Sequence, residues 1–314
     1  MSESLVHDPR TVQILRFDGR LDLSAPEVRR SALEVLENGG VVLLSESGFE
    51  LTAIERDLIS RPQELLAGFK EPEVPNGRPT IVFDPARGKI TRHFNTVRGK
   101  MVRANVRREC RPQLEAMMAR FSTWVEETVA TLFPTYEKVL VPDRVTYRPY
   151  ARAARQALHV DSSYGYPTQG RGMFRLFCNI DPKHRPRVWQ VGEPFESFVG
   201  RFLPSAKLRR PHWTASLLGH LGIVRGSKTM YDQMIAEIRR LAKRDEEYQR
   251  TAPREIVEFP SGSCWFAITD LVPHGAMSGQ HSLDQTFFLP ASGMKDPSQS
   301  SLRILERLSG RLLA

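Results

Sequence analysis

Two histidines and one aspartate have the types and spacing of a metal site. Residues 158–161 read Leu-His-Val-Asp, so His159 and Asp161 are two positions apart, and His274 follows much later within Leu-Val-Pro-His-Gly. In an extended strand, side chains two positions apart point to the same face. Two imidazoles and one carboxylate form the facial triad that holds non-haem Fe(II) and leaves positions open for a co-substrate and O2. We therefore expect these three residues to be the metal ligands and the catalytic centre.

The segments around the three residues are predicted strands. Residues 144–150 precede the His-x-Asp pair, residues 173–180 form an apolar run that follows it, and residues 259–266 are a turn and then an apolar strand before His274. Alternating turns and strands favour a double-stranded antiparallel barrel. The arrangement resembles the jelly-roll core of the Fe(II)/2-oxoglutarate dioxygenases. A surface His-x-Asp pair with an unrelated core histidine is the structural alternative.

The resemblance implies 2-oxoglutarate as co-substrate, and its remote carboxylate needs a fixed cation. A bidentate guanidinium is the natural choice. Many dioxygenases carry it shortly after the distal histidine, but no Arg or Lys follows His274 until Lys295. Arg175, set in an apolar strand, resembles the basic residue of the JmjC-type branch. An ion pair of Arg175 with Asp181 or another acid is the structural alternative.

Four further residues complete the predicted co-substrate site. Tyr150 matches a tyrosine that precedes His-x-Asp in some hydroxylases, and Asn179 has the same face parity as Arg175. Arg148 and Gln285 are the next candidates for the carboxylate clamp if Arg175 does not serve.

Positive charge is concentrated in two blocks. The chain has a net charge of +9 and a pI of about 9.7. Residues 87–111 hold nine Lys or Arg and one acid, and residues 201–254 hold twelve basic and five acidic residues. Such blocks indicate an anionic partner, although a solvated basic face is the alternative. We expect the first block to contact the acceptor through Arg92, Arg98, Lys100 and Arg103.

Cysteine usage and the N-terminus favour a cytoplasmic protein. The three cysteines have no metal-site spacing, and an odd number without a secretion signal suits a reducing compartment. The first residues lack a signal peptide's basic and apolar regions. No run approaches the roughly 18 apolar residues of a membrane span.

The expected fold class is mainly β with flanking helices (α+β), with a double-stranded β-helix (jelly-roll, cupin-like) core and a helical insertion. We expect a single dioxygenase domain over 1–314. Its parts are an N-terminal helix and strand support region (1–135), the jelly-roll core (140–195 and 255–291), the insertion (196–254) and a helical tail (300–314).

Local patterns predict individual elements of this domain. Helical spacing predicts helices over 26–38, 112–133 and 230–249, and a capping box of Thr52 and Glu55 predicts another that begins near Leu51. Residues 181–194 are rich in proline and charge and are predicted to form a loop.

Three stretches resemble one family of dioxygenases in particular, the Kdo hydroxylases. They are residues 159–163 (His-Val-Asp-Ser-Ser), 171–180 and 187–189, together with the long insertion before His274. The resemblance implies Fe(II), 2-oxoglutarate and O2 as cofactors. It also implies hydroxylation at C3 of the 3-deoxy-D-manno-oct-2-ulosonic acid (Kdo) of Kdo-lipid A, in lipopolysaccharide inner-core assembly.

The expected location is therefore the cytoplasm, with attachment to the anionic cytoplasmic face of the inner membrane as a further expectation. The insertion combines apolar and basic residues, and the tail adds Arg303, Arg307 and Arg311 at helical spacing, which suits such a surface. Closure of the barrel end by these apolar residues is the alternative.

Other classes of function fit less well. A dioxygenase of a protein side chain or a small metabolite would use the same triad. A nucleic-acid-binding protein would explain the charge, but the basic blocks lack interleaved aromatic residues and match no known reader motif. A non-catalytic barrel would leave the triad without a purpose.

Overall fold

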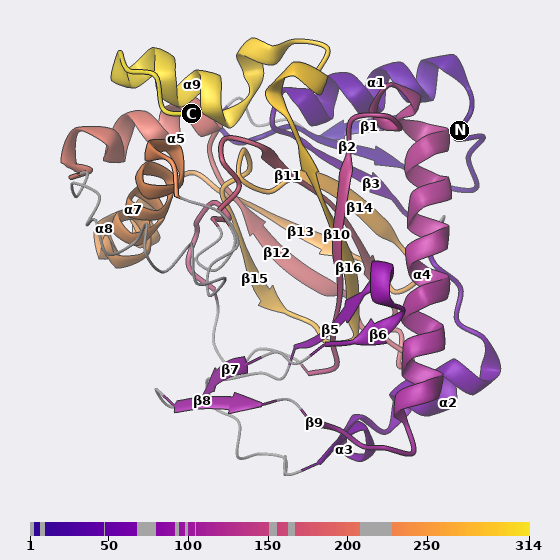
Figure 1. The fold of residues 1–314 in the computed structure, drawn as a ribbon. Coiled ribbons are helices and arrows are strands. Elements are labelled where there is room, and N and C mark those ends of the chain that lie inside the picture. Colours follow the sequence, from indigo (N-terminus) through magenta and orange to yellow (C-terminus); the bar gives the residue numbers. More distant parts are fainter. Residues whose placement is uncertain are drawn as a thin grey trace.

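The computed structural model describes most of the chain. The described residues are 3–6, 10–46, 48–67, 80–91, 94–97, 100–103, 105–150, 156–162, 167–207 and 228–314. Figure 1 shows a strongly twisted sheet at the centre, with helices along one side and at one corner.

The larger sheet combines the N-terminal region with the barrel core. Its order in the described chain is β1-β2-β3-β14-β11-β16-β10-β5-β6. Pairing is antiparallel except between β2 and β3, which are parallel. The strands are β1 (Glu3–Val6), β2 (Ile14–Phe17), β3 (Val41–Leu44), β5 (Ile81–Asp84), β6 (Lys89–Ile90), β10 (Val141–Arg148), β11 (Gly172–Asn179), β14 (Cys264–Ile268) and β16 (Ser282–Leu289). Strands from the predicted support region therefore widen the sheet that carries the core.

The smaller sheet carries the distal histidine. It has the order β13 (Glu255–Phe259), β12 (Arg187–Val191) and β15 (His274–Ser278). An antiparallel bridge between His159 and His274 adds the 158–161 segment beside β15. Two facing sheets, antiparallel except for the β2–β3 pair, are the predicted jelly-roll core, so the expected fold class is confirmed.

The strand register shows which side chains of the larger sheet point into the barrel and which point away from it. Arg175 lies opposite Thr286, and the next residue, Leu176, lies opposite Gln285. Because side chains alternate across a strand, these pairs occupy opposite faces. Phe177, on the Arg175 face, packs against Trp189 of the smaller sheet with ring centroids 4.9 Å apart. The Arg175 face therefore lines the barrel interior.

The Leu176 face packs against the helices that follow the N-terminal strands. These are α1 (Pro26–Glu37), α2 (Ala53–Ser60), α3 (Pro62–Leu65) and α4 (Arg111–Leu132). The apolar stripe of α4 is buried, as its spacing predicted, and Figure 1 shows α4 running along the sheet edge. The predicted capping box is confirmed, because Thr52 and Glu55 exchange side-chain and backbone hydrogen bonds at the start of α2.

The insertion and the tail form a helical corner. The described helices there are α5 (Phe195–Phe202), α7 (Met230–Arg244), α8 (Glu246–Thr251) and α9 (Ser301–Ser309), and Figure 1 shows them gathered on one side of the barrel. The single helix expected over 230–249 is two helices. Asp245 separates them, since its side chain accepts a hydrogen bond from the Tyr248 N–H and caps α8. Gly310, at φ 64°, ends α9.

The loop predicted over 181–194 is wrong for its second half. Residues Arg187–Val191 form β12, the middle strand of the smaller sheet, paired with both β13 and β15. The prolines and charges of residues 182–186 dominated the sequence pattern, and the short apolar alternation that follows them carries the strand.

Smaller elements complete the described chain. A hairpin of β7 (Phe94–Val97) and β8 (Lys100–Arg103) stands away from the large sheet in Figure 1. The remaining pairs and turns are β4 (Leu66–Ala67) with β9 (Asn105–Val106), and the 3-10 helices η1 (Pro85–Arg87), η2 (Pro134–Tyr136), η3 (Leu203–Ser205), η4 (Ala291–Gly293) and η5 (Pro297–Gln299). None of the described helices is both long enough and apolar enough to cross a membrane.

Candidate metal centre

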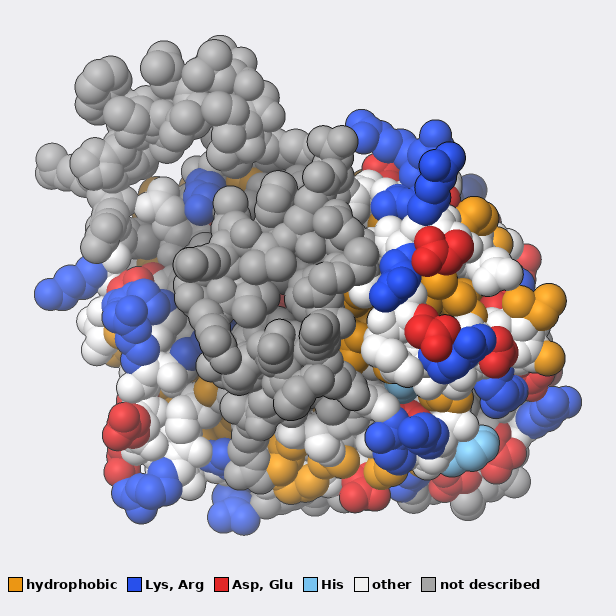
Figure 2. Space-filling view, turned by 90° about the horizontal axis from the view of Figure 1, so that it is seen from below, with side chains coloured by type: hydrophobic (Ala, Val, Ile, Leu, Met, Phe, Trp, Pro, Cys, Tyr) orange, Lys and Arg blue, Asp and Glu red, His pale blue; other side chains and the backbone are white. Residues whose placement is uncertain are grey.

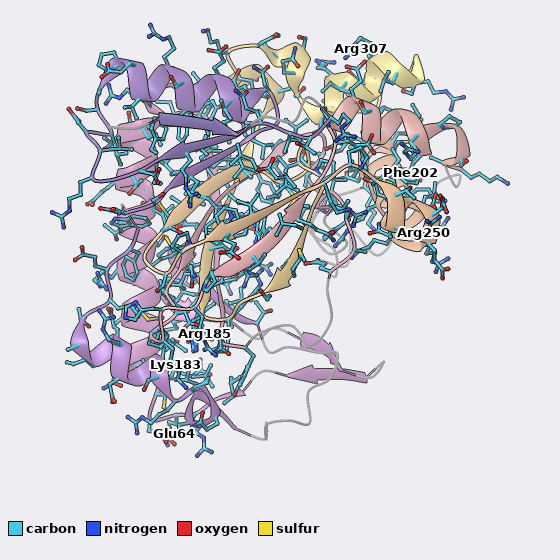
Figure 3. All side chains as sticks on the ribbon, turned by 180° about the vertical axis from the view of Figure 1, so that it is seen from behind. Glu64, Lys183, Arg185, Phe202, Arg250 and Arg307 are labelled. Atoms are coloured by element: carbon cyan, nitrogen blue, oxygen red, sulfur yellow. The ribbon has the colours of Figure 1, made fainter. Side chains whose placement is uncertain are left out.

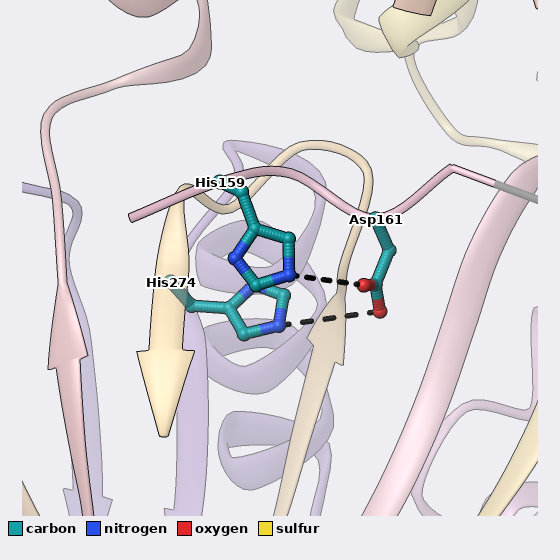
Figure 4. Close-up of side chains that lie close together, drawn as sticks. All are labelled: His159, Asp161 and His274. Carbon is teal, nitrogen blue, oxygen red and sulfur yellow. Dashed lines mark ion pairs between the residues drawn. The ribbon is translucent and has the colours of Figure 1, made fainter. Parts of the chain in front are cut away.

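The predicted triad comes together at one point of the smaller sheet. One ligand atom from each of His159, Asp161 and His274 lies within 4.8 Å of the others. Nε2 of His159 is 3.7 Å from Asp161 Oδ1, and Nε2 of His274 is 4.0 Å from Asp161 Oδ2 (Figure 4). No other cluster of three such groups occurs among the described residues. The alternative of a surface pair and an unrelated histidine therefore does not describe this fold.

Both imidazoles are held with Nε2 toward the centre. His159 Nδ1 is 2.8 Å from the Ala157 carbonyl oxygen, and His274 Nδ1 is 2.8 Å from that of Val272. If each Nδ1–H donates to its carbonyl, each Nε2 keeps a lone pair for a metal, as metal-binding histidines require. The reciprocal backbone hydrogen bonds between His159 and His274 fix the spacing of the two rings.

Charge and burial favour the ligand form of all three groups. Burial lowers the pKa of both imidazoles, so they are neutral near pH 7. Burial alone would raise the pKa of Asp161, but the neighbouring His274 and Arg175 outweigh it and hold that pKa well below its usual range. Neutral imidazoles and an ionised carboxylate are the protonation states that bind a divalent metal.

Arg175 joins the triad to a second carboxylate. Its Nη1 donates to Asp161 Oδ2 at 2.8 Å, and its Nη2 donates to Asp284. Arg148 pairs with the same Asp284, whose side chain is fully buried, and Thr146 donates to it at 2.6 Å. The predicted alternative, an ion pair with an acid, is therefore present, and the acids are Asp161 and Asp284.

The charge balance of Arg148, Arg175, Asp161 and Asp284 favours the binding of one more carboxylate. Two guanidiniums, Arg148 and Arg175, face two carboxylates. A metal ion on Asp161 would take up one of those negative charges and leave one cation in excess. Arg175 Nε is buried and has no hydrogen-bond partner among the described residues. The remote carboxylate of 2-oxoglutarate would supply both the charge and the acceptor, so the residues fit this co-substrate.

Two of the predicted co-substrate residues lie elsewhere. Gln285 lies opposite Leu176 and Val145, so its side chain is on the helix-covered face and not on the face of Arg175. Asn179 shares the face of Arg175 but is four residues, or about 13 Å, along the strand. Its amide donates to the carbonyls of Arg185 and Phe259. Neither residue is brought to the triad.

The other predicted residues lie at the margin of the described structure. Tyr150 is half-buried against the larger hydrophobic cluster. Arg92 and Arg98 lie outside the described residues, and Lys100 and Arg103 are described only as part of the β8 backbone. The roles of these five residues stay predictions.

Several residues around the triad were given no role in the predicted site. The Trp189 ring stacks on His274 with centroids 4.8 Å apart and an interplanar angle of 22°. A side chain on Gly275 would meet the Gln156 carbonyl oxygen at 2.4 Å, so only glycine fits beside His274. The Gln156 amide lies 3.1 Å from His159 Nε2. No sequence pattern marks Gln156, whereas Trp189 lies in the 187–189 stretch that resembles the Kdo hydroxylases, although the loop prediction missed its strand.

A jelly-roll whose interior carries two histidines, an aspartate and paired arginines defines a class of enzyme. The protein is a non-haem Fe(II)- and 2-oxoglutarate-dependent dioxygenase. The sequence model of the family described as "3-deoxy-D-manno-oct-2-ulosonic acid (Kdo) hydroxylase" matches residues 21–312. The chain belongs to that family.

Solved structures agree with this membership. The apo structure of the Kdo hydroxylase KdoO, a non-haem Fe(II)/2-oxoglutarate-dependent dioxygenase, superposes with a TM-score of 0.80 at 29% identity, covering 96% of this chain and 97% of that one. The same protein in complex with 2-oxoglutarate and Fe(III) gives 0.79, and in complex with succinate and Fe(III) gives 0.80, at the same identity and coverage. No curated protein matches the sequence.

Proposed function

We propose that this enzyme hydroxylates C3 of the Kdo sugar of Kdo-lipid A to give the 3-hydroxylated sugar Ko, with succinate and CO2 as co-products. The observation that carries the proposal is the centre formed by two buried histidines and the partly buried Asp161, in a chain that matches the Kdo hydroxylase family over residues 21–312. The reaction would belong to lipopolysaccharide inner-core assembly.

The residues divide the work of this reaction. His159, Asp161 and His274 would hold Fe(II), which together with 2-oxoglutarate activates O2 so that one oxygen enters a C–H bond and the other enters succinate. Arg175, with Arg148 behind it, would orient the co-substrate through its remote carboxylate. Burial of the two imidazoles keeps competing water away from the ligand atoms.

A cation beside the metal centre supports an anionic acceptor. Arg239 of α7 donates from Nη1 to the backbone oxygen of Ser162 at 3.2 Å and to its Oγ at 3.4 Å, one residue beyond Asp161. In Kdo the carboxylate carbon is two bonds from C3. An acceptor that presents C3 to the metal centre must place its carboxylate close by, where a guanidinium would bind it.

Arg239→Gln is expected to raise the apparent KM for the Kdo acceptor by about tenfold or more, because one charge-assisted hydrogen bond contributes about 1.5–3 kcal/mol. Acceptor-independent decarboxylation of 2-oxoglutarate should change little. Steady-state succinate release with and without acceptor measures both quantities. If the two activities fall together, Arg239 supports the Asp161 segment and does not bind the acceptor.

The basic segment around the β7–β8 hairpin is the second proposed acceptor contact. It includes Arg92, Arg98, Lys100 and Arg103, which would meet the sugar carboxylate or the lipid phosphates. Replacing Lys100 and Arg103 by glutamate is expected to weaken acceptor binding and to spare the decarboxylation that occurs without acceptor. A parallel loss of both activities would indicate a folding defect.

Succinate release with a panel of acceptors tests the proposed substrate. Kdo-lipid A is expected to stimulate release well above the basal rate, whereas lysine- or proline-containing peptides and single-stranded DNA should not. Stimulation by a peptide or a small metabolite alone would favour a different dioxygenase. Stimulation by DNA alone would favour a nucleic-acid enzyme.

Attachment to the cytoplasmic face of the inner membrane is part of the proposal. Burial and ion pairing in the described structure reduce the number of residues that could contact the membrane. Phe202 of the insertion is buried. Arg307 is paired with Glu196 by two hydrogen bonds, and Arg303 is paired with Glu306. Figure 3 shows Phe202 and Arg307 at the helical corner, and Figure 2 shows basic and acidic side chains interspersed on the described part of another face. The apolar residues Trp213, Leu217, Leu218 and Leu221 lie outside the described residues.

Flotation with liposomes tests this attachment. Binding is expected with vesicles that contain anionic lipid and should weaken as salt is raised, because exposed charges are screened over about 8–10 Å at physiological ionic strength. Neutral vesicles are the control. Equal recovery with both kinds of vesicle, or none with either, would contradict electrostatic attachment.

A further inference from the structure

The segment that carries His159 lies at an open edge of the smaller sheet. His159 exchanges backbone hydrogen bonds with His274, at 3.1 and 2.9 Å. Successive residues of a strand direct their backbone groups to opposite sides, so the N–H and C=O of the preceding residue, Leu158, point away from β15. Leu158 is fully buried, and its backbone groups therefore need partners other than water.

One side chain from the insertion supplies both partners. Gln249 of α8 accepts a hydrogen bond from the Leu158 N–H at Oε1 (2.8 Å), and its Nε2 donates to the Leu158 carbonyl at 3.0 Å. The same Nε2 donates to the Ala242 carbonyl of α7 at 2.8 Å. The amide of Gln249 thus takes the place that a neighbouring strand would have at this edge.

Arg254 fixes Gln249 and also reaches the metal centre by a second route. Its Nη2 donates to the Gln249 carbonyl at 2.7 Å, and its Nη1 donates to Gln190 Oε1 at 2.9 Å. Gln190 Nε2 in turn donates to the Gln156 carbonyl at 2.6 Å, and the Gln156 N–H donates to Ala276 of β15 at 2.9 Å. Both routes therefore end on the residues that lead into His159, one at Leu158 and the other at Gln156.

We propose that Gln249 is a positioning residue for the metal ligand His159, and that Arg254 supports it. The insertion would then be part of the metal centre and not only a cover for the acceptor. Ligand side chains must be held to within about half an ångström to bind a metal well, and packing and hydrogen bonds from the surrounding residues set that precision. The inference concerns metal binding, so it does not depend on which acceptor the enzyme uses.

Gln249→Met tests this role, because methionine keeps the length and volume of glutamine but makes neither backbone hydrogen bond. Arg250→Met is the matched control. Arg250 is the next residue of α8, is largely exposed, and pairs only with Glu247 among the ion pairs of the described chain (Figure 3). The measurements are Co(II) affinity by titration calorimetry and the rise in Tm that saturating Co(II) produces, both without turnover.

The expected result for Gln249→Met is Co(II) binding about 10- to 100-fold weaker and a smaller metal-induced rise in Tm, with Arg250→Met close to wild type. A purely structural role would lower the Tm of the metal-free and metal-bound protein equally and leave the affinity unchanged, which would overturn the proposal. If Gln249→Met does not fold, Gln249→Glu retains an acceptor for the Leu158 N–H. It is expected to fold and to bind Co(II) with intermediate affinity, and wild-type affinity in that variant would equally overturn the proposal.

Discussion

His274→Ala is expected to abolish turnover while the protein stays folded. The variant removes one of the three proposed metal ligands, whose ligand atoms lie within 4.8 Å of one another. Loss of a ligand leaves two groups, which hold a divalent ion poorly, and activity should fall below detection. His159→Ala and Asp161→Ala should give the same result. Succinate release measures activity, and circular dichroism reports the fold.

A histidine outside the centre provides the control for this experiment. His184 is exposed, and its backbone has a φ of 56°, which asparagine also tolerates. His184→Asn should therefore keep full activity and metal affinity. Full activity in His274→Ala would contradict the assignment of the metal centre, because no other described cluster could take over.

Arg175→Ala is expected to raise the 2-oxoglutarate concentration needed for half-maximal activity by about a hundredfold or more. Breaking a buried charged pair costs about 3–5 kcal/mol, and each 1.4 kcal/mol corresponds to a factor of ten. The apparent requirement for the sugar acceptor should change far less. Arg175→Lys should also be impaired, because an ammonium group does not reproduce contacts to two carboxylates.

Variants of Arg148 and Arg171 help to interpret the result for Arg175→Ala. Arg175 also contacts Asp161, so a loss confined to metal affinity would identify it as a support for the ligand. Arg148 pairs with Asp284, and Arg148→Ala should raise the 2-oxoglutarate requirement without weakening Co(II) binding. Arg171, whose guanidinium lies over the Phe288 ring, is the control. An unchanged 2-oxoglutarate requirement in Arg175→Ala would move the clamp to Arg148.

The grouping of His159, Asp161 and His274 could be predicted from the sequence because it depends on local strand parity. His159 and Asp161 need only an extended backbone to face the same way. His274 follows an apolar strand, which indicates a buried position. The jelly-roll class follows from the same alternation of turns and strands. These features require no knowledge of how distant strands are aligned.

The surroundings of the centre depend on long-range register and could not be predicted. Whether Gln285 or Asp284 faces Arg175 is decided by the alignment of β16 with β11, and a shift of one residue exchanges the faces. Gln249 meets Leu158 from 91 positions away, through a side chain that mimics a strand. No local pattern marks a glutamine for that task.

This enzyme uses Fe(II) and 2-oxoglutarate in a reaction that hydroxylates Kdo. Mass spectrometry of Kdo-lipid A, incubated with the reconstituted enzyme under labelled O2, tests it most directly. The account predicts one labelled oxygen at C3 of the sugar, one succinate formed for each hydroxylation, and no product when either Fe(II) or 2-oxoglutarate is omitted. An unmodified glycolipid in the presence of rapid succinate release, or hydroxylation that persists without 2-oxoglutarate, would contradict it.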